Sequence, residues 1–174
     1  IFGRAKGRIV VATFASLLSR VQLVIETAAR FGRRVAVAGR SMEENVAIAE
    51  GLGYVRFPEG VRVPLHEIGS LPDERVCILA TGSQGEPNAA LARMAAGNFR
   101  SVTIREGDTV VLSAKAIPGN ETAIYRNIDG LFMRGADVIY GEKAGIHVSG
   151  HAAQEELKTI LNLLRPQHFV PVHG

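Results

Sequence analysis

Three histidines near the end of the chain are the residues best suited to chemistry. His147 and His151 stand four residues apart in "HVSGHAAQEEL", with Ser149 and Gly150 between them, and His173 follows in "FVPVHG". Imidazoles bind zinc and transfer protons, and a turn of small residues before a helix can hold a phosphate on its free backbone N–H groups. The stretch therefore has three interpretations: half of a metal site, a phosphate-binding turn, or an ordinary turn that happens to contain histidine.

The spacing favours the phosphate-binding turn over a metal pair. Gly150 and the helix predicted to follow it make a shared helical face for the two histidines unfavourable, and a zinc site also needs a third ligand and usually a nearby carboxylate. The backbone donors of residues 149–152, the Ser149 hydroxyl and one or both imidazoles are sufficient to surround a phosphate at a helix N-terminus. His66 and His168 stand alone and are interpreted as structural or exposed.

Other polar residues directly follow the predicted strands. Because the carboxyl ends of parallel strands share one edge of a sheet, we expect these residues to gather there. The chain contains neither a P-loop nor a dinucleotide-binding fingerprint, and a glycine-rich turn alone is a weak signal. In chain order the residues are Thr13, Ser16 and Ser19, then Arg40 and Ser41, then Ser83 and Gln84 in "TGSQGEP", then Ser113 in "SAKAIPGN".

The elements that must position these residues alternate along the chain. Continuous β-branched and apolar runs predict strands over residues 8–15, 33–39, 75–82, 108–114, 136–141 and 168–174. Apolar stripes at helical spacing predict helices over residues 16–30, 41–53, 87–97, 121–134 and 153–164. The alternation predicts an α/β fold of the Rossmann-like kind, with a doubly wound, mainly parallel sheet and helices on both faces.

Composition narrows the class of protein. A chain of 174 residues, 47% of them hydrophobic, is long enough for one well-buried domain, and no apolar run reaches the roughly 18 residues of a membrane span. The single cysteine, Cys77, lies in "RVCILA", which predicts a buried thiol in a reducing cytoplasm. Eight of the 20 Lys and Arg residues, but only one acid, Glu26, fall within residues 1–40. That third of the chain can attract polyanions, or it can be a set of solvated helix ends.

Five stretches, in this order, resemble a known family. They are "ATFASLLSRVQ", "GRSM", "LATGSQGEP", "LSAKAIPGNE" and "HVSGHAAQEELKTILNLLRPQHFVPVHG". Together they resemble the beta-CASP domain of ribonuclease J over essentially the whole chain. The resemblance implies that a metallo-β-lactamase domain with two zinc ions hydrolyses RNA phosphodiesters. The beta-CASP domain is inserted into that domain and forms the other wall of the RNA cleft.

The resemblance also implies roles for individual residues. His151 matches the catalytic histidine that acts at the scissile phosphate, and His173 matches a histidine that binds zinc. Other residues are expected to bind the 5′-monophosphate or the backbone phosphates of RNA. These are Ser113, His147, Ser149, Gly150 and Ala152, joined by Ser83 and Gln84 from the glycine-rich turn.

The chain departs from the family pattern in several places. The main zinc motif, HxHxDH, and the later bridging aspartate are absent. An acidic position found in many beta-CASP enzymes falls near Leu23, and the closest acid is Glu26. Ala114 and Lys115 stand where some relatives have additional serines, which weakens a phosphate-binding role for Ser113.

These observations give one main hypothesis about the whole chain. Residues 1–174 are expected to be a single beta-CASP domain excised from a larger metal-dependent ribonuclease, with residues 165–174 leading back toward its metallo-β-lactamase domain. The chain alone is expected to be inactive and to bind no stoichiometric zinc. The full-length protein is expected to act in the cytoplasm on 5′-monophosphorylated RNA, as a homodimer or tetramer.

Two rival interpretations use the same residues. One is a nucleotide- or sugar-phosphate-binding Rossmann-like domain of another enzyme. The other is a scaffold without catalytic function, in which the histidines only cap turns.

Overall fold

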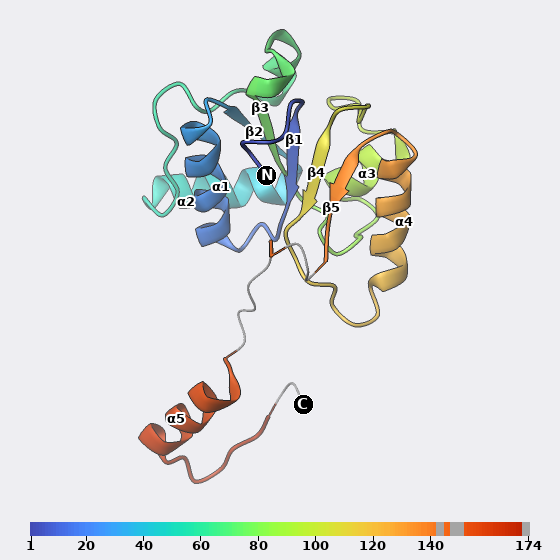
Figure 1. Ribbon diagram of the computed structural model, residues 1–174. Helices are drawn as coiled ribbons and strands as arrows, with labels where there is room; N and C mark the ends of the chain where they lie inside the picture. Colours follow the sequence, from blue (N-terminus) through green and yellow to red (C-terminus); the bar gives the residue numbers. More distant parts are fainter. Residues whose placement is uncertain (142–144, 147–151, 172–174) are drawn as a thin grey trace.

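A five-stranded sheet organises the chain, and the computed structural model describes residues 1–141, 145–146 and 152–171 (Figure 1). All strand pairs are parallel, and the order across the sheet is β2-β3-β1-β4-β5. This confirms the predicted doubly wound α/β class. The strands are β1 Ile9–Ala12, β2 Arg34–Ala38, β3 Val76–Ala80, β4 Thr109–Leu112 and β5 Asp137–Ile139.

Helices cover both faces of this sheet, as predicted. One face packs against α1 and α2, and the other packs against α3 and α4 (Figure 1). The helices are α1 Leu18–Arg30, α2 Arg40–Gly51, α3 Ala90–Ala96 and α4 Glu121–Phe132, with short 3-10 segments η1 Leu65–Ser70 and η2 Asp73–Arg75 before β3.

The strands are apolar at nearly every position because both of their faces are buried. In β1, Ile9 and Val11 point into the core beneath α1 and α2, whereas Val10 and Ala12 point into the core beneath α3 and α4. The same alternation runs through the neighbouring strands, since side chains of a strand alternate between the two faces. This is why the sequence shows continuous hydrophobic runs rather than a polar–apolar alternation.

The outer edge of β2 is covered by the chain itself. Val35 donates its N–H to the Val61 carbonyl at 2.7 Å and accepts from the Val63 N–H at 3.0 Å. This short pairing occupies hydrogen-bonding groups that an exposed edge strand would otherwise present to another chain. It also gives the irregular segment between α2 and β3 a fixed place beside the sheet.

The C-terminal helix α5, Gln154–Leu164, lies apart from the sheet in Figure 1. None of its residues is buried, and its apolar side chains, among them Leu157, Ile160 and Leu164, are exposed. The strand predicted over 168–174 is wrong for residues 168–171, which form no regular element, while 172–174 lie outside the described residues. A strand needs a neighbour to pair with, and this segment, like α5, is exposed to solvent.

Among the described residues, none of the helices has the length and the apolar composition needed to span a lipid bilayer.

Candidate functional site at the carboxyl edge of the sheet

Two neighbouring strands of the sheet, β1 and β4, are followed by helices on opposite faces. After β1 the chain enters α1 on one face, and after β4, which pairs with β1, it enters α4 on the other face. In open parallel sheets such a switch point leaves a crevice at the carboxyl ends of the strands, where ligands bind. Thr13 and Ser113 directly follow β1 and β4, and the Ser113 N–H donates to the Ala12 carbonyl at 2.8 Å.

Ser113 is the centre of a hydrogen-bonded cluster at this crevice. Its side chain is buried, and its hydroxyl donates to the Ile146 carbonyl at 2.7 Å. Arg20, in the first turn of α1, donates from Nη1 to the Ser113 carbonyl and hydroxyl oxygens, both at 2.8 Å, and to the Ile146 carbonyl at 3.1 Å. The cluster joins α1, the end of β4 and the segment that follows β5.

Gln84 links the turn after β3 to the loop after β4. Its side-chain amide donates to the Lys115 carbonyl at 2.9 Å, and its amide oxygen accepts from the Ile117 N–H at 2.9 Å and from Asn120 Nδ2 at 3.5 Å. The Gln84 N–H itself donates to the Glu86 carboxylate at 3.1 Å. A buried amide that satisfies both its donor and its acceptor in this way holds two loops in one arrangement.

Two hydroxyls at the same edge have no such partner. The side chains of Thr13 and Ser83 are almost fully buried, and neither hydroxyl has a hydrogen-bond partner among the described residues. An unpaired buried hydroxyl costs free energy, so its persistence at a strand end is a feature to be explained. Ser83 is one of the residues predicted to contact RNA, and its buried hydroxyl is not engaged by any described residue.

The glycines of "TGSQGEP" are required by packing as well as by conformation. Gly85 has a positive φ of 79°, and a Cβ there would lie 2.7 Å from the Ala123 Cβ in α4. Gly82 has a φ of 110°, and a Cβ would lie 3.0 Å from the Cβ atoms of Ala89 and Leu91. Left-handed conformations and close approach both favour glycine. The prediction that small residues let a ligand approach this turn therefore competes with a purely structural reason for the same glycines.

The turn that carries most of the predicted site is only partly described. His147, Ser149, Gly150, His151 and His173 lie outside the described residues. Ala152 is described, and it is exposed.

The helix that follows Ala152 begins with a capping contact from one of its own carboxylates, which occupies a backbone N–H group and adds negative charge at the helix start. The Glu156 carboxylate accepts from the Ala153 N–H at 2.7 Å, just before α5 begins. This contact holds the first turn of α5, and the backbone N–H groups at a helix start carry partial positive charge. Ala152 therefore lies next to a helix N-terminus and open to solvent.

The described residues do not form a zinc centre. No group of three or more His, Cys, Asp or Glu side chains in the described ranges is placed to hold a metal ion. The acid closest to the predicted acidic position, Glu26, accepts a hydrogen bond from the Gln22 side chain at 2.9 Å. Because α1 starts at the carboxyl edge and runs toward the amino edge, Glu26 lies in the half of α1 that is farther from the crevice.

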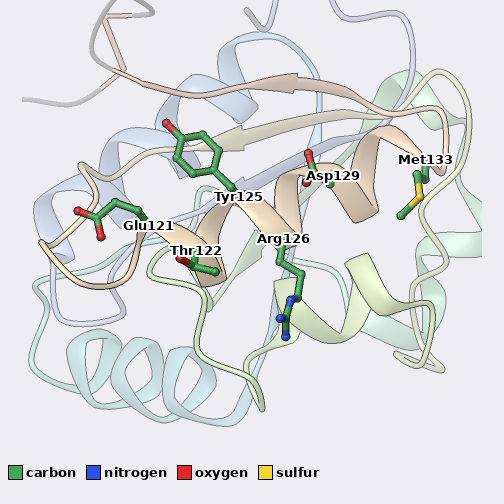
Figure 2. A pocket seen from close by; sticks show the side chains of 6 residues that line it. All are labelled: Glu121, Thr122, Tyr125, Arg126, Asp129 and Met133. Atoms are coloured by element: carbon green, nitrogen blue, oxygen red, sulfur yellow. The ribbon is translucent and has the colours of Figure 1, made fainter.

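Two surface pockets differ in their relation to this edge. The larger, of about 620 Å³, lies along the exposed side of α4 and is lined by none of the predicted site residues (Figure 2). The smaller, of about 260 Å³, lies beside α1 and includes Arg20, Ser113 and Ile146 in its lining. Location therefore favours the smaller pocket as part of the site. The residues of the larger pocket are Glu121, Thr122, Tyr125, Arg126, Asp129 and Met133.

Arg20 is the residue of this edge that sequence reasoning missed. The sequence places it in "FASLLSRVQ", one turn into the helix after β1, among many other arginines of the N-terminal third. A cation at the start of a helix that faces polar strand ends was the available signal. Its partners, Ser113 and Ile146, lie 93 and 126 residues away, so only the folded chain identifies them.

Two family models match the chain. "Ribonuclease J, beta-CASP domain" matches residues 6–131, and "Zn-dependent metallo-hydrolase RNA specificity domain" matches residues 139–174. The first covers strands β1 to β4 and ends within α4, and the second begins at the last residue of β5 and includes α5.

Similar curated proteins are named Ribonuclease J. The one from a Synechocystis species is 52% identical over all 174 residues, the one from Thermus thermophilus 49%, and the one from Helicobacter pylori strain J99 45%. The chain spans 27%, 30% and 25% of the length of these relatives, respectively. The resemblance read from the five sequence stretches is thereby confirmed.

Proposed function

We propose that this chain, which belongs to the ribonuclease J beta-CASP family, supplies the RNA-binding wall of a zinc-dependent ribonuclease. The full-length protein hydrolyses RNA phosphodiester bonds, both endonucleolytically and from the 5′ end, in RNA processing and decay. One observation carries the proposal. The polar cluster of Arg20, Ser113 and Ile146 stands at the switch point of the sheet and leads directly, through Ile146, into the histidine-containing turn.

The residues of that turn contact the substrate in this proposal. His151 donates a hydrogen bond or a proton at the scissile phosphate, as a neutral-to-charged imidazole can near physiological pH. Other residues of the edge bind RNA phosphates through hydroxyls and backbone N–H groups. They are His147, Ser149, Gly150 and Ala152 in the turn, with Ser83; Gln84 and Ser113 support the phosphate-binding edge by holding the neighbouring loops through their side chains.

Metal chemistry belongs to another part of the full-length protein. Two zinc ions held by the metallo-β-lactamase domain would supply the activation of water and the stabilisation of charge on the phosphate. His173 contributes one ligand from the end of this chain, because residues 165–174 lead back toward that domain. The family model over residues 139–174 is described as Zn-dependent, which supports this assignment. Residues 1–174 form a single insert that is inactive without the metal-binding part.

The location and assembly of the full-length protein follow the same proposal. It acts in the cytoplasm on RNA that carries a 5′-monophosphate, and it forms a homodimer or tetramer. The single buried thiol, Cys77, supports a reducing compartment. The relatives are three to four times longer than this chain, which supports a role inside a larger protein.

Binding measurements test the RNA-binding part of the proposal. The full-length protein is titrated with 5′-monophosphorylated RNA, 5′-hydroxyl RNA and a mononucleotide at several salt concentrations. We expect affinity to rise with RNA length and with the 5′-phosphate, and to fall steeply with salt, because phosphate contacts release counterions. Equal affinity for the mononucleotide and for long RNA would instead support a nucleotide-binding enzyme.

His151→Ala in the full-length protein tests the catalytic assignment. We expect kcat to fall by about 10²–10⁴-fold while KM changes little, because general acid–base catalysis contributes rate rather than affinity. His66→Ala is the matched control, since His66 is exposed in η1, the segment that leads to the amino end of β3. A rise in KM with unchanged kcat would make His151 a binding residue.

Metal analysis of the 174-residue chain tests the proposal that zinc is bound by another part of the full-length protein. We expect no stoichiometric zinc after dialysis, because the described residues hold no cluster of ligands and His173 alone cannot complete a tetrahedral site. Two tightly held zinc ions per chain would contradict the proposal.

A further inference from the structure

Arg20 connects three segments that are far apart in the sequence. Its Nη1 atom donates to the Ser113 carbonyl at 2.8 Å, to the Ser113 hydroxyl at 2.8 Å and to the Ile146 carbonyl at 3.1 Å. The Ser113 hydroxyl donates to the same Ile146 carbonyl at 2.7 Å. One carbonyl oxygen is thus held by two side chains, one from α1 and one from the end of β4.

We propose that Arg20 is a positioning residue for the ribonuclease reaction. It fixes the carbonyl of Ile146, which directly precedes His147 in the sequence and stands five residues before the proposed catalytic residue His151. The inference rests on the proposed function, and it adds a residue to which neither the resemblance nor the family models assign a role.

The attachment of Ile146 is firm because it has two independent parts. Its carbonyl accepts the two hydrogen bonds, and its side chain packs against the hydrophobic core beneath α1 and α2. Ser113 is itself held on β1 through its N–H bond to Ala12. Ile146 is therefore tied to the sheet, not merely to another loop.

Arginine suits this position for two physical reasons. A guanidinium offers several donors in a fixed plane, so that one nitrogen can serve neighbouring oxygens, and it stays charged across the physiological pH range. None of its three acceptors here is a carboxylate, so these contacts do not neutralise its charge. Lysine keeps the charge but replaces the planar donor with a flexible one, which makes Arg20→Lys a partial substitute.

Kinetics of Arg20→Gln in the full-length protein test the proposal, with 5′-monophosphorylated RNA as substrate. Misplacing a catalytic group by about 1 Å can cost about 10²-fold in rate, so we expect kcat to fall at least about tenfold while KM stays within about twofold. Arg20→Lys should recover part of the lost rate. Arg100→Gln removes the same charge from an exposed turn before β4, at the amino edge, and should behave as wild type.

Ser113→Ala provides a second variant that does not depend on the folding of Arg20→Gln. It removes the hydroxyl that shares the Ile146 carbonyl, so we expect kcat to fall in the same direction. The double variant should lose little more than Arg20→Gln alone, because both changes act through one carbonyl and effects at a shared partner are not additive.

Three results would overturn the proposal. A kcat of Arg20→Gln within twofold of wild type means that the clamp has no role in the reaction. A rise in KM with unchanged kcat means that Arg20 contacts the substrate directly. Fully additive effects of the two variants mean that they do not act through Ile146. If wild type and Arg100→Gln both fail to cleave RNA, the proposed function fails as well, whereas an active wild type beside an unaffected Arg20→Gln removes only this inference.

Discussion

The two edges of the parallel sheet treat their buried polar residues differently. At the amino edge, Arg8 donates from Nε and Nη2 to the Asp108 carboxylate at 2.8 and 2.6 Å, and from Nη2 to the Thr103 carbonyl at 2.7 Å. The hydrogen bonds to Asp108 raise the pKa of Arg8 despite its burial, which acts in the opposite direction. Arg33 donates to carbonyls of Gly7, Ala5 and Val76.

At the carboxyl edge the same kinds of group are less fully satisfied. Arg20 meets carbonyls and a hydroxyl but no carboxylate in its three contacts. The buried hydroxyls of Thr13 and Ser83 have no partner among the described residues. The difference therefore lies in the Arg8–Asp108 ion pair, which stabilises the amino edge, and in the two unpaired hydroxyls at the carboxyl edge.

The comparison also refines the expectation about the basic N-terminal third. Of its arginines, Arg8 and Arg33 are buried and committed to partners within the domain. They are neither solvated helix ends nor free to attract a polyanion. Burial also lowers the pKa of Arg33, the opposite of what happens to Arg8, because Arg33 has no carboxylate in hydrogen-bonding contact in the described chain.

Among these variants, Asp108→Ala should lower the free energy of unfolding most, because it removes the ion pair at the amino edge. It removes the partner of Arg8 and leaves a charge almost fully buried, which typically costs about 3–5 kcal/mol. The free energy of unfolding of the 174-residue chain, measured in urea, checks this. Glu155→Ala is the control, since Glu155 pairs with Lys158 at 2.7 Å on the exposed surface of α5 and should cost less than about 1 kcal/mol. Equal losses in the two variants would contradict the contrast.

Cys77 should make a smaller, pH-dependent contribution in the strand next to Arg33. Burial raises the pKa of the Cys77 thiol from its ordinary 9.0 to about 12, against the opposing charge of Arg33. Because the folded-state pKa is raised, the contribution to stability is complete below pH 9 and is lost as pH rises toward 12.

Urea unfolding at pH 8 and pH 10 measures this loss. Wild type should lose about 1 kcal/mol more than Cys77→Ala over that interval, since one pKa unit corresponds to about 1.4 kcal/mol. The cavity left by the alanine affects both pH values alike and cancels in the difference. Identical pH dependence in the two proteins would show that the thiol is not shielded from water.

Ser83→Ala should have the smallest effect on the free energy of unfolding. It therefore tests whether a polar residue at the carboxyl edge affects RNA affinity rather than stability. Removing a buried hydroxyl that has no partner is expected to change the free energy of unfolding by less than about 1 kcal/mol, or to increase it. If the hydroxyl contacts an RNA phosphate, the affinity of the full-length protein for RNA should fall by about three- to tenfold. Ser101→Ala, in an exposed turn before β4, should change neither quantity. A loss of stability without a loss of RNA affinity would show that Ser83 has a structural role only.

Much of the fold was predictable because burial on both faces leaves a strong signal. The run at 8–15 is apolar at nearly every position, and β1 occupies its middle, Ile9–Ala12. The run at 168–174 was equally apolar in its first half, but residues 168–171 form no strand and are exposed. Composition identifies a segment that can become a strand, whereas pairing needs a neighbour that the local sequence does not specify.

The candidate site was predictable in position but not in its internal contacts. Parallel strands bring Ser83, Gln84 and Ser113 to one edge, as expected from their places after β3 and β4. The hydrogen bonds that tie Gln84 to residues 115–120, and Ser113 to Ile146, connect segments about 30 residues apart and depend on how the loops pack. Gly85 is similar, since its contact with Ala123 exists only once α4 lies against the turn.

By itself, the sequence determined the alternation of strands and helices, the edge at which polar residues gather, and the family. Hydrophobic periodicity and motif order are properties of the linear sequence, so they can be read without the folded structure. Only the tertiary structure decided which polar residues satisfy one another. Arg8 and Arg20 are both arginines near β1, yet one meets Asp108 and the other meets Ser113 and Ile146. Those partners lie about a hundred residues away, and only the packing of the sheet determines which arginine meets a carboxylate and which meets carbonyl and hydroxyl oxygens.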